Sequence, residues 1–61
     1  MEKIFDSGKM LEVKVGGSFV VWVRSEDPKE FSVCREGAEK YVRMGWNELT
    51  LDEQNAVEKF N

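Results

Sequence analysis

"MLEVKVGGSFVVWVRS", residues 10–25, decides the fold. Residues 10–15 alternate in polarity, and residues 18–24 are rich in β-branched and aromatic side chains, and both patterns are typical of strands. Gly16 and Gly17 stand between them, and a Gly-Gly pair accepts the positive φ angles that tight hairpin turns require. The stretch therefore predicts an antiparallel hairpin, 10–15 with 18–24, in which Val15 lies opposite Ser18 and Met10 opposite Val23.

This hairpin has two different faces. Side chains alternate between the faces of a sheet, and residues directly opposite each other share a face. One face carries only apolar side chains, from Leu11, Val13, Val15, Val20 and Trp22. The other carries Met10, Phe19, Val21 and Val23 beside Glu12 and Lys14. We expect the uniformly apolar face to be covered by helices and the mixed face to stay at least partly open.

The segments on either side of the hairpin add further strands. "KIF" (3–5) predicts a short N-terminal strand that turns back through Gly8 in the left-handed conformation. Residues 30–33 predict a strand beside 18–24, followed by a helix over 34–44 that Gly45 ends as a left-handed cap. The alternative is a longer helix that opens at Asp27 and Pro28, since apolar residues from Phe31 to Val42 also recur at helical spacing. The patterns leave residues 28–34 open between strand and helix.

The C-terminal segment predicts a second helix. Thr50-Leu51-Asp52-Glu53 fits a capping box, in which Thr50 and Glu53 each bond the other's backbone N–H. Trp46 precedes this helix, and we expect it to be a core or half-buried bracket between the two helices; the alternative is an exposed anchor for a partner. The predicted fold is one α+β domain over 1–61, with an antiparallel sheet of about three strands packed against two short C-terminal helices.

Composition excludes several kinds of chemistry. The chain of 61 residues has no histidine and one cysteine, Cys34, so histidine catalysis and a structural zinc site are excluded. Carboxylate neighbours such as Glu26 with Asp27 are explained by turns and caps, and pockets of ~300 Å³ or more are hard to build in so small a domain. We expect no enzyme, no cofactor and no metal. The lone cysteine and the lack of an apolar leader or span predict a cytoplasmic protein with no membrane contact.

The charge distribution and the mixed face indicate a binding function. The whole net charge of −3 comes from residues 47–61, which contain four carboxylates and one lysine. We expect a small regulator or inhibitor, of the kind that phages and mobile elements encode, that binds another protein or itself as a homodimer. The residues expected to bind the partner are Met10, Phe19, Val21, Val23, Asp52, Glu53 and Glu58.

Two alternatives remain open beside this one. A structural homo-oligomer would use the same mixed face. Binding of single-stranded nucleic acid would use Phe19 and Trp22 with Lys9, Lys14 and Arg24. Recognition of a duplex by a helix-turn-helix does not fit, because the last helix is acidic and phosphate binding depends on clustered cations.

Overall fold

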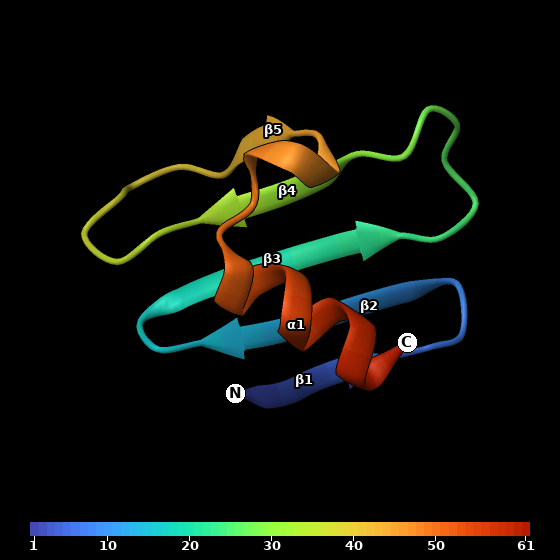
Figure 1. The fold of residues 1–61 in the computed structure, drawn as a ribbon, viewed down its shortest axis with the longest axis horizontal. Coiled ribbons are helices and arrows are strands. Elements are labelled where there is room, and N and C mark those ends of the chain that lie inside the picture. The colour runs from blue at the N-terminus through green and yellow to red at the C-terminus, as the bar shows by residue number, and fades with distance from the viewer.

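A computed structural model describes all residues, 1–61, as a five-stranded antiparallel sheet with one helix on one face (Figure 1). The strands lie in the sheet in chain order, so each pairs with the next. The elements are β1 (Glu2–Asp6), β2 (Met10–Val15), β3 (Ser18–Val23), β4 (Phe31–Cys34), β5 (Val42–Met44), the 3₁₀ helix η1 (Trp46–Glu48) and α1 (Leu51–Phe60). The predicted α+β class is confirmed, but the sheet has more strands than expected and only one α-helix follows it.

The central hairpin has the predicted register. Leu11 lies opposite Trp22, Val13 opposite Val20, and Val15 opposite Ser18. Gly16 in the turn has φ +60°, a conformation that glycine adopts without strain. The turn and the polarity pattern together specified this part of the fold.

The N-terminal strand also forms as predicted. β1 pairs with β2 through a bulge between Lys3 and Phe5, and the return turn places Gly8 at φ +87°. The N–H of Gly8 donates to Asp6 Oδ1 (2.9 Å), which fixes the turn. β1 is an edge strand of the sheet beside β2 and does not fold over the mixed face of the hairpin, and Ile4 and Phe5 are exposed.

The predicted helix over 34–44 is wrong. Residues 31–34 form β4 beside β3, which settles the strand-or-helix question for this segment, and 42–44 form β5 beside β4. Gly37 turns the chain between them at φ +86°, which interrupts a helix. Gly45 is not a left-handed cap either, because its φ is −83°. Pairing to the sheet edge outweighed the helical spacing of the apolar residues.

Helix α1 begins at the predicted capping box. Thr50 Oγ1 accepts from the N–H of Glu53 (3.1 Å), and Glu53 Oε1 accepts from the N–H of Thr50 (2.8 Å). Ala56 and Val57 are buried and Phe60 packs against the core, so α1 presents an apolar side to the sheet.

The core lies between the sheet and these two helical segments. Its buried side chains are Leu11, Val13, Val20, Trp22, Phe31, Val33, Leu49, Ala56 and Val57. In Figure 1, α1 crosses in front of β3 and β2, while η1 lies near β4 and β5. Trp46 in η1 is half-buried, packs against the core and lies 5.7 Å from Phe31 between ring centroids, which confirms the expected half-buried position. It does not bracket two helices, because the predicted helix over 34–44 does not form.

No helix of this chain is long and apolar enough to cross a membrane.

Candidate functional site

The face of the sheet opposite α1 is not covered by any helix or strand. The cross-strand pairs place Met10 with Val23, Lys14 with Phe19, and Glu12 with Val21 on this side. We call this surface the open face and define its apolar centre as Met10, Phe19, Val21 and Val23. All four side chains are half-buried, because their neighbours on the sheet shield them only from the sides. The structure therefore brings together the four apolar residues expected to bind a partner.

Two exposed aromatic residues extend the open face beyond its centre. Phe5 on β1 lies opposite Glu12 and is 46% exposed. Tyr41 directly precedes β5 and is 50% exposed. Burial raises the pKa of the Tyr41 phenol, and the nearby charges of Glu12 and Cys34 raise it further. These neighbours place Tyr41 at the open face.

The position of Tyr41 was not predicted from the sequence. Residues 34–44 were expected to form a helix, in which the alternation of side chains along a strand does not apply. With β5 known, Arg43 pairs with Ser32 on the open face, and Tyr41 lies two residues before Arg43. The period-2 rule for strands then predicts that Tyr41 is on the same face.

Charged side chains lie at the border of the open face. The Lys14 ammonium lies 5.8 Å from the ring centroid of Phe19. Arg43 Nη2 donates to Glu26 (3.0 Å), and its Nε lies 3.6 Å from Glu30. Glu12 lies inside the open face, between Phe5 and Val21. Apart from this carboxylate, an apolar centre with charged groups around it resembles the anatomy of protein interfaces, in which polar residues form the rim.

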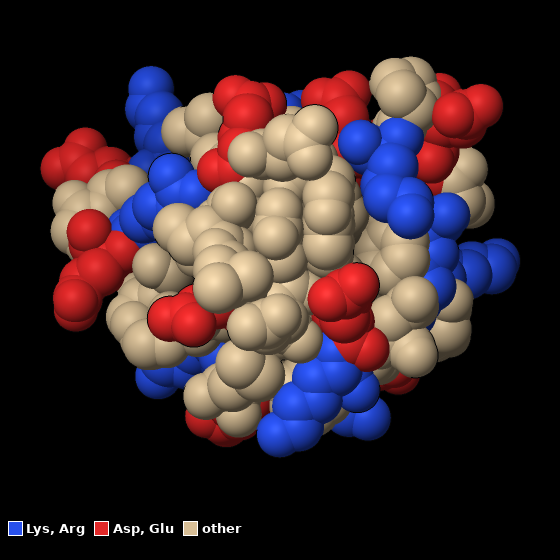
Figure 2. All heavy atoms as spheres, viewed as in Figure 1, with Lys and Arg blue, Asp and Glu red and all other residues tan.

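The helix contributes less negative charge to the surface than expected. Glu53 was expected to bind a partner, but it is only 3% exposed and is bonded to Arg35, so its carboxylate is not available at the surface of the free protein. Asp52 and Glu58 are exposed, and Lys59 offsets one of them. Figure 2 shows the side of the molecule on which α1 lies, with mainly uncharged side chains in the middle and charges of both signs around them. No continuous acidic row remains on α1.

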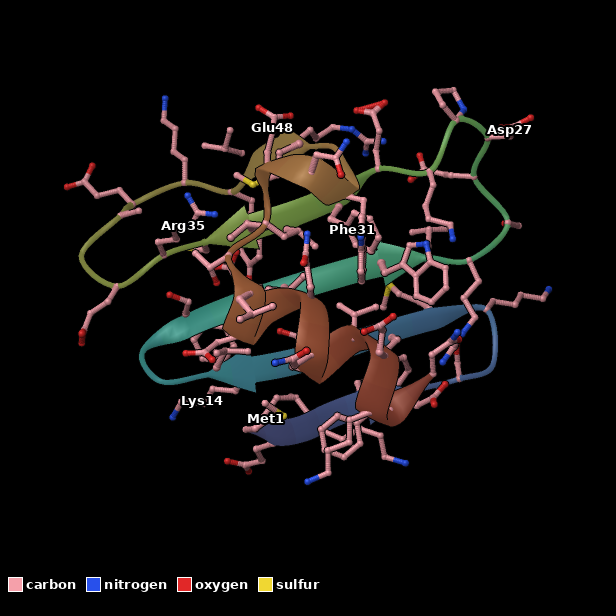
Figure 3. All side chains as sticks on the ribbon, in the orientation of Figure 1. Met1, Lys14, Asp27, Phe31, Arg35 and Glu48 are labelled. Atoms are coloured by element: carbon pink, nitrogen blue, oxygen red, sulfur yellow. The ribbon has the colours of Figure 1, made fainter.

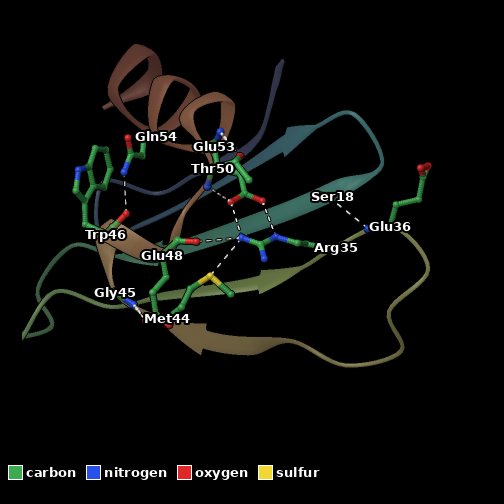
Figure 4. A network of polar contacts seen from close by, with 10 residues as sticks. All are labelled: Ser18, Arg35, Glu36, Met44, Gly45, Trp46, Glu48, Thr50, Glu53 and Gln54. Atoms are coloured by element: carbon green, nitrogen blue, oxygen red, sulfur yellow. Dashed lines mark hydrogen bonds and ion pairs between the residues drawn. The ribbon is translucent and has the colours of Figure 1, made fainter.

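Glu53 instead joins three parts of the fold (Figure 4). Arg35, which directly follows β4, donates to Glu53 through Nη2 (2.9 Å) and Nε (3.1 Å), and also donates to the carbonyl of Glu48 (3.3 Å). Gln54 Nε2 donates to the carbonyl of Trp46 (2.9 Å). The hydrogen bond from Arg35 holds the pKa of the Glu53 carboxyl below its usual value, although burial opposes this shift. The network attaches α1 and η1 to the sheet.

The residues expected for nucleic-acid binding do not share one surface. Trp22 belongs to the covered face and is 6% exposed. Arg24 donates to Asp6 (2.9 Å) and to Asn61 Oδ1 (3.1 Å), and the bond from Arg24 lowers the pKa of Asp6. Only Phe19 and Lys14 of that set lie together on the open face.

A concave feature lies on the covered side of the sheet. It is a pocket of 430 Å³ that we call the aromatic pocket. Its lining comes from Trp22, Lys29, Phe31, Trp46, Val57, Glu58 and Asn61. The expectation that so short a chain would not form a pocket of this size is wrong, because β3, β4, η1 and the end of α1 meet at one place. In Figure 3, Phe31 of the pocket lining lies near the middle of the molecule. Lys14 and Asp27, which do not line the pocket, lie at opposite sides.

The acidic side chains do not form a metal-binding group of three or more. Glu26 of the neighbouring pair Glu26 and Asp27 forms an ion pair with Arg43, and Glu53 forms one with Arg35. Protein-family models, curated proteins and solved structures give no match to this chain. The structure defines it as a small α+β domain with a five-stranded antiparallel meander, one covered face and one open face.

Proposed function

We propose that this protein is a non-catalytic binding module that docks on another protein through the open face and thereby regulates or inhibits it. The observation that carries the proposal is the apolar centre of Met10, Phe19, Val21 and Val23 on a sheet face that no other element covers. Contiguous apolar patches on a small domain commonly mark interaction sites.

The composition of the open face supports this proposal. Interface centres are depleted in charge and enriched in Tyr, Phe and Met, and all three types are present here. Tyr41 and Phe5 are exposed before docking, so burying them adds to the binding free energy. Lys14 and Arg43 at the border would set the orientation of the partner and its association rate more than the affinity.

The helix has a smaller part in this mechanism than the sequence suggested. Asp52 and Glu58 lie on α1, which covers the opposite face of the sheet, so they do not belong to the same contact surface. Their remaining contribution is long-range attraction to a basic partner, which salt at physiological concentration screens over ~8 Å.

The test compares tagged variants as baits in extract from cells that produce the protein. Val21→Glu and Val21→Lys each place a charge at the apolar centre. The first puts a carboxylate directly opposite Glu12, which is unfavourable across strands, whereas the second puts an ammonium there, which is favourable. Leu51→Glu is the matched control, because Leu51 is 70% exposed at the start of α1, away from the open face.

The proposal expects a partner that wild type and Leu51→Glu capture equally and that both Val21 variants lose while folded. Capture that persists in folded Val21→Lys contradicts the proposal. The solution mass of the wild type, measured by light scattering across concentrations, identifies the other possible occupant. A stable dimer that Val21→Lys dissociates would mean that a second copy of this chain occupies the open face.

A further inference from the structure

Glu12 is a carboxylate inside the open face. In the sheet it lies between Phe5 of β1 and Val21 of β3. It is half-buried and takes part in no ion pair. The centres of protein interfaces are depleted in charge, and glutamate is uncommon in strands. Glu12 therefore differs from its neighbours, and no ion pair within the fold uses its charge.

The charged groups on and beside the open face are more often negative than positive. Lys14 lies opposite Glu2 in the register of β1 with β2, and Arg43 is paired with Glu26 and Glu30. With the carboxylate inside the face, these groups comprise four carboxylates and two cations, a formal charge of −2. Complementary potentials favour association, so this surface fits a basic partner better than an acidic one.

Docking on the open face removes water from Glu12. Its cross-strand neighbours Phe5 and Val21 are apolar, so their side chains offer the carboxylate no hydrogen bond. Burying an ionised carboxylate without a counter-charge is strongly unfavourable. A partner that covers this face and binds tightly must therefore place a cation opposite Glu12.

The aromatic side chains around Glu12 favour arginine over lysine as that cation. Phe5 is 46% exposed and lies directly opposite Glu12. Burial raises the pKa of the Tyr41 phenol and the charge of Glu12 is the next largest cause, so Tyr41 also lies near Glu12. A guanidinium stacks on aromatic rings and donates two parallel N–H groups to a carboxylate, whereas an ammonium is more strongly hydrated and does neither as well.

We propose that the partner docked on the open face is a basic protein whose contact surface carries an arginine that pairs with Glu12 and stacks on Phe5 or Tyr41. This inference rests on the proposed function and names the chemistry of its partner. The apolar centre supplies the buried area, and Glu12 selects the partner, because a surface without the arginine leaves the carboxylate buried and unpaired.

The test uses a library of random linear peptides displayed on phage, selected on the immobilised wild-type chain. Methyl signals of Val21 and Val23 in NMR identify the selected peptides that bind the open face. The proposal expects these peptides to contain arginine more often than the unselected library does. A second selection on Glu12→Gln should show no such enrichment, and one on Glu12→Lys should enrich aspartate and glutamate instead.

A double-mutant cycle then tests the ion pair itself. The strongest open-face peptide is synthesised with its arginine and with citrulline, which has a similar shape but no charge. Citrulline should weaken binding to wild type about tenfold or more, and should have little effect on binding to Glu12→Gln. Glu2→Gln is the matched control, because it removes the same charge from the edge of the same face, and it should change the affinity by less than about threefold.

The possible failures are distinguishable from one another. Open-face peptides without arginine enrichment overturn the inference and leave the docking surface in place, because Lys14 would then neutralise Glu12 on docking. Equal effects of citrulline on wild type and on Glu12→Gln overturn it as well, since the arginine would act through general charge attraction. A selection in which no peptide shifts the methyl signals of Val21 and Val23 counts against the docking surface and this inference together.

Discussion

Replacing Glu53 with alanine should destabilise this protein more than replacing any other carboxylate on α1. The substitution removes the acceptor for the N–H of Thr50 (2.8 Å) and the acceptors for two bonds from Arg35 (2.9 and 3.1 Å). Loss of a helix cap costs about 1 kcal/mol. Hydrogen bonds to charged groups contribute about 1.5–3 kcal/mol, which we reduce to about 1–2 because 44% of the Arg35 side chain is exposed.

The sum is about 2–3 kcal/mol, a large part of the ~3–5 kcal/mol that a domain of this size usually has. At about 4–8 °C per kcal/mol for a small domain, the Tm of Glu53→Ala should fall by about 10–20 °C. Glu53→Gln keeps one oxygen for the cap but loses the charge and one of the two acceptors for Arg35, so it should cost about 1–2 kcal/mol.

Urea unfolding followed by tryptophan fluorescence measures both variants. Glu58→Ala is the matched control, because Glu58 is exposed on the same helix and forms no ion pair; it should stay within about 0.5 kcal/mol of wild type. A Glu53→Ala variant as stable as Glu58→Ala would refute the role given to the network around Arg35.

Three further predictions test other parts of the structure. The pKa values of Glu53 and Asp6 are lower in the folded state than in the unfolded chain, so the unfolded chain binds more protons in acid. The free energy of unfolding should therefore fall as pH drops below ~4.3. Urea titrations at several pH values measure this dependence, and Glu53→Gln should make it weaker. Gly37→Ala should destabilise by about 1–2 kcal/mol because φ is +86° there, whereas thermal melts of Gly45→Ala, at φ −83°, should match or exceed wild type. Tyr41→Ala should weaken partner binding about fivefold or more in calorimetry without loss of stability, and unchanged affinity would remove Tyr41 from the docking surface.

Local patterns predicted the parts of this fold that local interactions specify. The Gly-Gly turn and the alternation on both sides of it fixed the register of β2 with β3, because a shift by one residue would move the apolar side chains to the other face. The capping box gave the start of α1, since Thr50 and Glu53 are three residues apart and bond each other directly.

The other parts depend on contacts between distant residues. The sequence left residues 28–34 open between strand and helix, and pairing of Phe31 with Trp22 decided for the strand. Residues 42–44 form a strand in place of the predicted helix because Met44 pairs with Phe31. β5 has only three residues, too few for a polarity pattern to appear. The capping box predicted the local role of Glu53 but not its burial, because its partner Arg35 lies 18 residues away.

The candidate site, like the fold, could be predicted only where local patterns specify it. The cross-strand register was enough to place Met10, Phe19, Val21 and Val23 on one surface, and the structure agrees. Tyr41 joins them only through β5, so it was missed. The aromatic pocket forms where four separate elements come together, and no pattern of spacing along the chain predicts this arrangement.

The most direct test of the docking proposal is the solvent accessibility of individual methyl groups, measured with a soluble paramagnetic agent before and after partner binding. In the free protein at low concentration, the methyl groups of Val21 and Val23 should relax faster than those of Val13 and Val20, which are buried under α1. In the complex, Val21 and Val23 should become protected while Val13 and Val20 stay unchanged. If Val21 and Val23 are as accessible in the complex as in the free protein, the partner does not bind the open face and the central claim is wrong.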